Sequence, residues 1–251
     1  MANSIDDVID QMRERGIEPP PASLLAADGK KVTWAGDARK PKKKNAWAAL
    51  REWTSPKSGR TFVVGRYGIR DDHWMVEPTQ SEWTPADKLA WQEKRRILEK
   101  EEQQDRQSAA ELCRAKADKI WSRSREDGAS DYLQRKRVGA YGVRFAFGKV
   151  LVPLIDLAGT LHGLQWIAPD GGKLFGTGTA KEGHFHLIGE VADTQPIVFS
   201  EGYASGATDY MATGWPVVVC FDAGNIMPVV AAWRKLYPEH RFIIAADDDR
   251  H

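Results

Sequence analysis

The stretch IVFSEGYASGATDYMATGWPVVVCFD, residues 197–222, holds two short apolar runs, each followed by an acidic residue, with a helical pattern between them. Ile197–Ser200 and Pro216–Phe221 predict buried strands because they are apolar and rich in β-branched residues. Ala204–Thr213 predicts the helix that joins them. A strand, a helix and a second apolar strand in this order favour a parallel sheet that is covered on both faces.

The same alternation continues toward the end of the chain. Asn225–Leu236 predicts a helix, which we expect Asn225 to cap, and Arg241–Ala246 predicts a third strand. Ligands of such sheets bind beyond the carboxyl ends of the strands. Glu201, Asp222 and Asp247–Asp249 follow the three predicted strands, so the sequence predicts an acidic edge there.

These acids favour a site for divalent cations. In an extended segment alternate side chains share a face, so Asp247 and Asp249 should project together while Asp248 points away. With Glu201 they would form a cluster of like charges that cations must neutralise. Carboxylate oxygens suit Mg²⁺ or Mn²⁺, and two such ions support phosphoryl transfer. The alternative is that the aspartates are ordinary turn residues.

The segment before this sheet has the pattern of antiparallel strands. Lys149–Asp156 and Thr160–Ile167 predict a hairpin, because a turn signal at Ala158-Gly159 separates them. Lys173–Phe175 and Phe185–Ile188 predict further short strands.

Thr84 predicts the start of a long helix, because a capping hydroxyl is followed by proline and then by an acid. No further proline or glycine occurs until Gly128, so the helix should have about 40 residues. Glu99–Gln107 has no apolar residue and should be solvated, whereas we expect Leu112, Ala115 and Ile120 to pack on a neighbour.

The N-terminal part of the chain is basic. Residues 1–18 predict an amphipathic helix, and the stretch from there to Val76 predicts a small β-rich module. Residues 29–70 carry 12 Lys or Arg and 2 acids, whereas residues 190–251 carry 4 Lys or Arg and 9 acids. This asymmetry favours nucleic-acid binding, although a solubilising lysine cluster is the alternative. The proposed DNA-binding residues of the module are Lys42, Lys43, Lys44, Trp47 and Trp53.

The order of these motifs resembles a known family. A Glu-Gly pair followed by Asp-x-Asp on consecutive strands looks like the Toprim domain of bacterial primases, topoisomerases and some nucleases. The similarity is greater to primases of conjugative plasmids and phages, and it covers roughly residues 130–251. The segments that carry it are GKVLVPLIDLAGTLHG (148–163), Lys173–Phe175 with Gly189, IVFSEGYASGA (197–207), ATGWPVVVCFDAGN (212–225) and IIAADDD (243–249).

The resemblance implies a DNA primase that makes RNA primers on single-stranded DNA from ribonucleoside triphosphates, with Mg²⁺ or Mn²⁺ and with a replicative helicase as a further partner. Glu201 would bind a metal or assist proton removal, and Asp247 and Asp249 would bind metal. A complete Toprim domain would continue beyond His251, so we expect the chain to be truncated there. The residues implied in nucleotide or template binding are Arg144, Lys149 and Lys173.

The predicted fold class is α/β (α+β as a whole), with a Toprim-like parallel sheet preceded by a small mixed β subdomain. The expected divisions are a basic, Trp-rich module over 1–80, a helical linker over 81–127, the basic half of the primase core over 128–192 and the Toprim-like domain over 193–251.

Two other functions are compatible with the acidic motif. A Toprim-type nuclease would use the same metals, and a non-catalytic fragment would only bind single-stranded DNA. The two cysteines, Cys113 and Cys220, exclude a disulfide framework and a zinc ribbon, and no apolar run could cross a membrane. We therefore expect a cytoplasmic protein.

Overall fold

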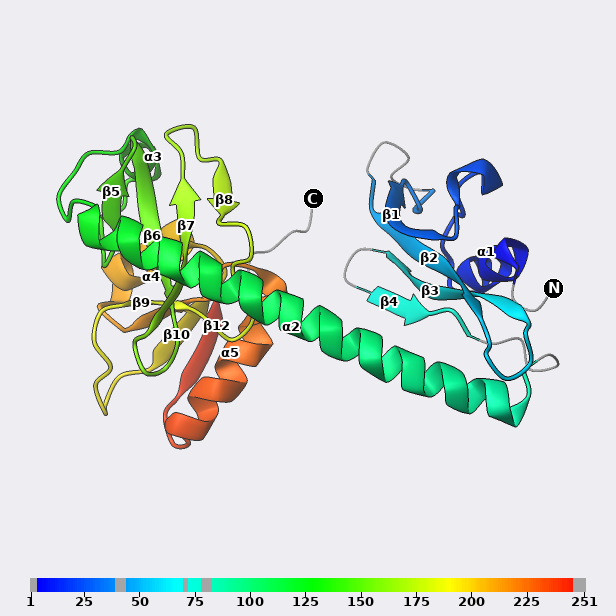
Figure 1. Ribbon diagram of the computed structural model, residues 1–251. Helices are drawn as coiled ribbons and strands as arrows, with labels where there is room; N and C mark the ends of the chain where they lie inside the picture. Colours follow the sequence, from blue (N-terminus) through cyan, green and yellow to red (C-terminus); the bar gives the residue numbers. More distant parts are fainter. Residues whose placement is uncertain (1–3, 39–43, 70–71, 78–82, 246–251) are drawn as a thin grey trace. The chain divides into compact units, whose positions relative to one another are not determined.

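The computed structural model describes residues 4–38, 44–69, 72–77 and 83–245 (Figure 1). The chain divides into two compact units, Met1–Glu101 and Glu102–His251, which we call the N-terminal and C-terminal units. Helices and strands are both present, so the fold class is mixed α/β, as predicted. No helix within the described ranges is at once long and apolar enough to cross a membrane.

The N-terminal unit is an antiparallel sheet with strand order β1-β2-β3-β4. The helix predicted at the N-terminus is present, and it buries Val8, Ile9 and Met12 in the same core cluster as Leu50 and Tyr67 of the sheet. The β-rich module predicted from the sequence is therefore confirmed. Its elements are α1 (Ile5–Glu14), η1 (Ala22–Leu24), β1 (Asp28–Trp34), β2 (Ala46–Thr54), β3 (Thr61–Ile69), β4 (Asp72–Met75) and the first part of α2 (Pro85–Arg123).

Helix α2 begins where the sequence predicts. The Asp87 amide donates to the Thr84 hydroxyl at 3.1 Å, and the Thr84 amide donates to the Asp87 carboxylate at 3.2 Å, which closes a capping box. Hydrogen bonds from Ser55 and Thr84 lower the pKa of Asp87 to about 2. The carboxylate therefore stays charged at the positive end of the helix.

The middle of α2 is exposed throughout Glu99–Gln107, as predicted, and Ile120 packs on a core cluster with Leu151 and Leu164, but the expectation is wrong for the other two packing residues. Leu112 is 65% exposed and Ala115 is also exposed. The buried residues are Cys113 and Ala117, four residues apart and hence on one side of the helix. Position 112 lies about 100° around the helix from position 113, so it faces water.

The C-terminal unit contains two four-stranded sheets. The first has the order β5-β6-β7-β8 with antiparallel pairs, and β6–β7 is the predicted hairpin. The second has the order β12-β10-β11-β9. The elements are α3 (Asp131–Lys136), β5 (Arg144–Ala146), β6 (Lys149–Ile155), β7 (Leu161–Ile167), β8 (Lys173–Phe175), β9 (His186–Ile188), β10 (Ile197–Ser200), α4 (Tyr203–Thr213), β11 (Val217–Val219), α5 (Ala223–Leu236) and β12 (Phe242–Ala245).

The second sheet is parallel only in part. Strand β10 pairs in parallel with β11 and with β12, as the alternating sequence pattern predicts. Strand β9 joins at the other side of β11 and runs antiparallel, so the sheet is mixed. Every other strand pair within the described ranges is antiparallel. The expectation of a purely parallel C-terminal sheet is therefore wrong for one of its four strands.

Helices cover both faces of this sheet, as expected. Val198 and Val217 point to the face where Ala207 of α4 is buried, whereas Phe199 and Val218 share a cluster with Trp233 of α5. Helix α4 packs closely against the strands at Gly206. A Cβ atom there would lie 2.9 Å from the Val219 Cγ2 atom, which is too close for any side chain.

The cap of α5 differs from the expectation. The helix begins at Ala223, and its N-cap is Asp222, whose carboxylate accepts from the Asn225 amide at 3.0 Å. Asn225 is buried, and its side chain donates to the carbonyls of His184 and Cys220. Asn225 therefore fixes the loop before β9 instead of capping the helix.

The buried His186 of β9 gives the unit a pH dependence. Its Nε2 atom lies 3.0 Å from the Tyr141 carbonyl oxygen and must carry the proton, while burial lowers the pKa of the ring to about 4. The neutral form is therefore favoured in the folded state, and its stabilising effect is complete above the unfolded pKa of about 6.5 and is lost as the pH falls toward 4.

Between pH 7.5 and pH 5 we expect protonation of His186 to lower the free energy of unfolding by about 2 kcal/mol. Urea unfolding of the wild type and of His186→Gln at both pH values measures it, because glutamine keeps a donor but does not titrate. His73→Gln is the control, since His73 is exposed and should retain the wild-type pH dependence. An identical pH dependence in His186→Gln and the wild type would refute the assignment.

Candidate active site

The predicted acidic edge starts from Glu201, which directly follows β10 and is half-buried. Ser200 lies opposite Ala245 in the parallel β10–β12 pair, so these two strands end at the same edge of the sheet. Asp247 and Asp249 lie outside the described residues. Their sequence positions are two and four residues beyond the end of β12.

The third acid of the predicted edge, Asp222, has other partners. One of its carboxylate oxygens caps α5, and the other accepts from the Lys181 Nζ at 2.7 Å. It is therefore a structural residue here. Within the described ranges no group of three or more His, Cys, Asp or Glu side chains could hold a metal ion. Metal binding by Glu201, Asp247 and Asp249 stays a prediction, and its donor set of hard carboxylate oxygens fits Mg²⁺ or Mn²⁺.

A cavity of about 440 Å³ lies at the start of α4, where it is lined by Gly202, the residue that follows Glu201 in the sequence. Lys173, one of the three predicted nucleotide-binding residues, lines it. Its Nζ atom lies 3.4 Å from the point that a Cβ atom on Gly202 would occupy. Gly202 is the N-cap of α4, so the Lys173 ammonium group and the positive end of the helix both lie at this cavity. The other main lining residues are Tyr132, Arg135, Lys136, Asp170 and Ser205.

Tyr203 fixes this end of α4. Its ring is fully buried, and its hydroxyl accepts from the Tyr141 amide at 2.7 Å and donates to the Gly139 carbonyl at 2.9 Å. Burial raises the pKa of the hydroxyl, which therefore stays protonated. The first turn of α4, and with it the Glu201-Gly202 corner, is thus held against residues 139–141.

The other two basic residues implied by the resemblance lie elsewhere in the unit. The Arg144 guanidinium lies 4.7 Å above the Trp121 ring, donates to the Trp121 carbonyl at 2.8 Å and forms an ion pair with Glu126. Lys149 starts β6, where it is half-buried opposite Ala146. Neither lines the cavity beside Glu201. Their binding role stays a prediction.

In the N-terminal unit the two tryptophans proposed for DNA binding have different neighbours. Lys44 is exposed, and Lys42 and Lys43 lie outside the described residues. The Lys31 Nζ covers the Trp47 ring at 4.4 Å. Trp53 is half-buried in an aromatic cluster with Phe62, Trp83 and Trp91.

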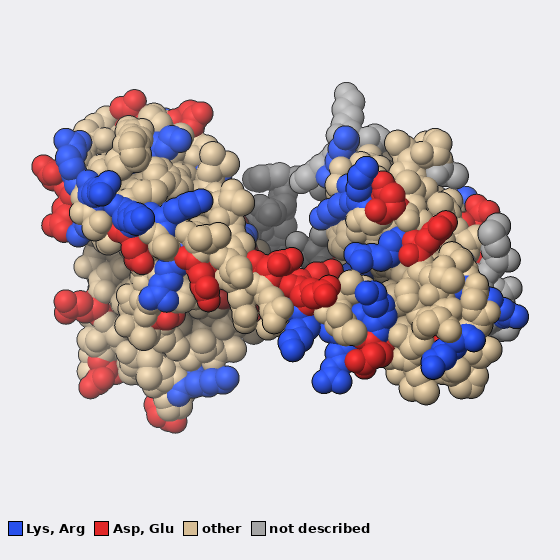
Figure 2. All heavy atoms as spheres, viewed as in Figure 1, with Lys and Arg blue, Asp and Glu red and all other residues tan. Residues whose placement is uncertain are grey.

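Sequence reasoning missed several of these neighbours. Arg135 and Lys136 line the cavity beside Glu201, and the basic run QRKR at 134–137 was the available signal. Figure 2 shows Lys and Arg side chains gathered on part of the viewed face of the C-terminal unit, with acids around them. Trp83 and Trp91 were missed because the first directly precedes the predicted helix start and the second lies in the helix, and a single tryptophan at either place gives no signal beyond its apolar character.

Comparison with known proteins gives two relatives with the same name. A curated protein of Escherichia coli named DNA primase TraC is 40% identical over 106 residues, which is 41% of this chain and 7% of that protein. A second Escherichia coli protein named DNA primase TraC is 38% identical over 105 residues, which is 41% of this chain and 10% of that protein. No family model matches the chain. The chain therefore has homologues named as DNA primases, and the matched segment is a small part of each.

Proposed function

We propose that this chain synthesises RNA primers on single-stranded DNA in plasmid or phage replication. The observation that carries the proposal is the identity of about 40% with proteins named DNA primase over two fifths of the chain. The Toprim-like order of motifs supports it, because Glu201 follows a strand that is parallel to its neighbours on both sides.

The residues beside Glu201 would bind the nucleotide. A nucleoside triphosphate carries its negative charge on phosphate oxygens, to which backbone amides at a helix N-terminus and a nearby lysine can donate hydrogen bonds. Gly202, the N-cap of α4, lets phosphate approach the backbone closely, and Lys173 reaches the same cavity. Tyr203 would keep this corner in place as the charge changes during the reaction.

Glu201, Asp247 and Asp249 would hold Mg²⁺ or Mn²⁺, which when bound supply charge neutralisation and alignment of the attacking and leaving oxygens. Glu201 would also orient the 3′-hydroxyl of the growing primer or accept its proton. Because the carboxylates repel one another, the divalent ion would also stabilise this edge of the sheet.

Incubation of the chain with single-stranded DNA, labelled ribonucleoside triphosphates and Mg²⁺ or Mn²⁺ tests the proposal. Short labelled RNA that depends on the template is expected. Shortening of the template strand would indicate a Toprim-type nuclease, and DNA binding without either product would indicate a non-catalytic fragment.

A further inference from the structure

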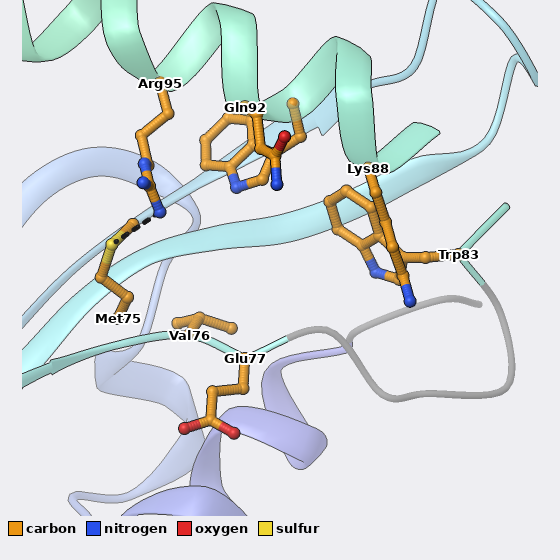
Figure 3. Close-up of a pocket in the computed structure, with 8 residues that line it drawn as sticks. Met75, Val76, Glu77, Trp83, Lys88, Gln92 and Arg95 are labelled. Atoms are coloured by element: carbon orange, nitrogen blue, oxygen red, sulfur yellow. Dashed lines mark hydrogen bonds between the residues drawn. The ribbon is translucent and has the colours of Figure 1, made fainter. Parts of the chain in front are cut away.

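A second cavity lies in the N-terminal unit, between α2 and the segment that follows β4. Its volume is about 420 Å³, which is within the range of about 300–1,000 Å³ that small-ligand sites occupy. All of its lining residues belong to this one unit. Figure 3 shows Lys88, Gln92 and Arg95 projecting from α2 over the segment that carries Met75, Val76 and Glu77.

Indole rings form a rigid wall of this cavity. Trp83 is stacked on Trp53 with ring centres 5.6 Å apart, and Trp91 lies 5.2 Å from Trp53. Phe62 closes the cluster, 4.0 Å from Trp83. Trp83 and Trp91 both line the cavity, and Trp91 is only half-buried. The packing behind the rings fixes their orientation, so a ligand would not need to order them.

The wall contains a donor without an acceptor. Trp83 is 6% exposed, and its Nε1 atom is buried with no hydrogen-bond partner among the described residues. Burying such a donor unpaired costs on the order of 1–3 kcal/mol. Trp83 is one of the residues that line the cavity. A ligand with a carbonyl oxygen would satisfy it.

The rim of the cavity is positively charged. Lys88 has no ion-pair partner among the described residues, whereas Arg95 forms an ion pair with Glu99, with 3.4 Å between Nε and Oε1. The acid on the rim, Glu77, is paired with Arg15 at 3.2 Å. In the sequence of the same unit, residues 29–70 include 12 Lys or Arg and 2 acids. An anionic ligand is therefore favoured over a neutral peptide.

We infer that this cavity binds an unpaired base of single-stranded DNA together with its flanking phosphate. The base would lie against the Trp91 ring and accept a hydrogen bond from the Trp83 indole at a base carbonyl, as cytosine, thymine and guanine allow. Lys88 and Arg95 would contact the phosphate. This combination of an aromatic platform and cations is the usual basis of single-strand binding. The inference rests on the proposed function and adds a template contact away from the acidic edge.

Fluorescence anisotropy with two labelled 15-residue oligonucleotides, oligo-dT and an abasic strand of the same charge, tests the inference on the whole chain. The wild type should bind oligo-dT at least about tenfold more tightly than the abasic strand, since stacking on an aromatic side chain is worth that much. In Trp91→Leu this preference should largely disappear. Near-ultraviolet circular dichroism and the melting temperature report whether the variant is folded.

The exposed Lys88 gives a second measurement that does not depend on the aromatic cluster. Lys88→Gln should reduce the slope of log affinity against log salt by about 0.7, the value for one phosphate contact on a single strand. Lys94→Gln is the matched control, because Lys94 is an exposed lysine of α2 that does not line the cavity. Its slope should equal that of the wild type.

Unchanged base preference in Trp91→Leu together with an unchanged salt slope in Lys88→Gln would overturn the inference. A peptide groove would replace the inference if a proline-rich peptide bound to the wild type and not to Trp91→Leu, and if oligo-dT showed no dependence on Trp91. Neither result concerns the acidic edge, because none of the residues that line this cavity belongs to it. Failure of this inference and failure of the proposed function are therefore distinguishable.

Discussion

Replacing Glu201 by glutamine should reduce primer synthesis by at least about 100-fold, because one metal-binding carboxylate is worth several kcal/mol in the transition state. Glutamine has nearly the same shape, and it removes only the negative charge and the ability to accept a proton. The half-buried position of Glu201 directly after β10 should be retained. The measurement is the rate of labelled RNA formation on single-stranded DNA at saturating Mg²⁺ or Mn²⁺.

Glu190→Gln is the matched control for this experiment. Glu190 is an exposed acid of the same unit that precedes β10, and its replacement makes the same change in net charge. It should leave the rate within about twofold, as expected for a surface substitution far from structural features. A Glu201→Gln variant that makes primers at the wild-type rate would remove Glu201 from the reaction.

The parts of the fold that the sequence predicted are those governed by local rules. The helix start at Thr84 follows from a capping hydroxyl, proline and an acid within four residues, and the structure has this capping box. The β10–α4–β11–α5–β12 order follows from apolar runs of strand length separated by helical periods. Gly214 ends α4 in the left-handed conformation with φ of 67°, which glycine tolerates without strain.

The features that the sequence did not predict depend on contacts between distant segments. Strand β9 pairs antiparallel with β11, and its His186 lies 5.8 Å from the Tyr203 ring and 3.0 Å from the Tyr141 carbonyl oxygen; no local pattern in the sequence contains these contacts. Asn225 was expected to cap α5, but its amide is used by the His184 and Cys220 carbonyls, so Asp222 caps the helix. The cap is therefore settled by the position at which the helix begins, at Ala223 directly after Asp222, and by the contacts that occupy the Asn225 side chain.

The candidate site divides in the same way. The position of Glu201 at a strand end could be predicted, because the apolar run before it shows where the strand ends. The position of Lys173 near Gly202 depends on how β8 of the first sheet packs near α4, which the sequence pattern does not contain. Arg144 has the same charge and was expected to share this role, but Trp121 and Glu126 already hold its guanidinium. Residue type therefore identified the candidate nucleotide-binding residues, and the tertiary contacts show which of them line the cavity at the start of α4.

Replacing Asp247 and Asp249 together by asparagine should remove detectable Mn²⁺ binding while the fold is retained. Asparagine keeps the size and one carbonyl oxygen of each side chain but loses the negative charges on which a hard divalent cation depends. Strands β10 and β12 end at the same edge of the sheet, with Ser200 opposite Ala245, so the acids that follow β12 in the sequence are the natural partners of Glu201. Isothermal calorimetry with Mn²⁺ at low ionic strength measures the effect.

Asp248→Asn is the control, since it removes one negative charge, from the residue between the two proposed ligands. If the segment continues in an extended conformation, side chains alternate, and Asp248 should point away from Glu201. Its replacement should weaken Mn²⁺ binding by no more than about threefold, as expected for a charge that lies nearby but does not coordinate. A loss of binding free energy in Asp248→Asn that is about half of the loss in the double variant would mean that the run attracts cations only by its total charge, because the single variant removes one charge and the double variant removes two. In that case Glu201→Gln would bind Mn²⁺ almost as well as the wild type, whereas a coordinated ion requires that all three proposed ligands contribute.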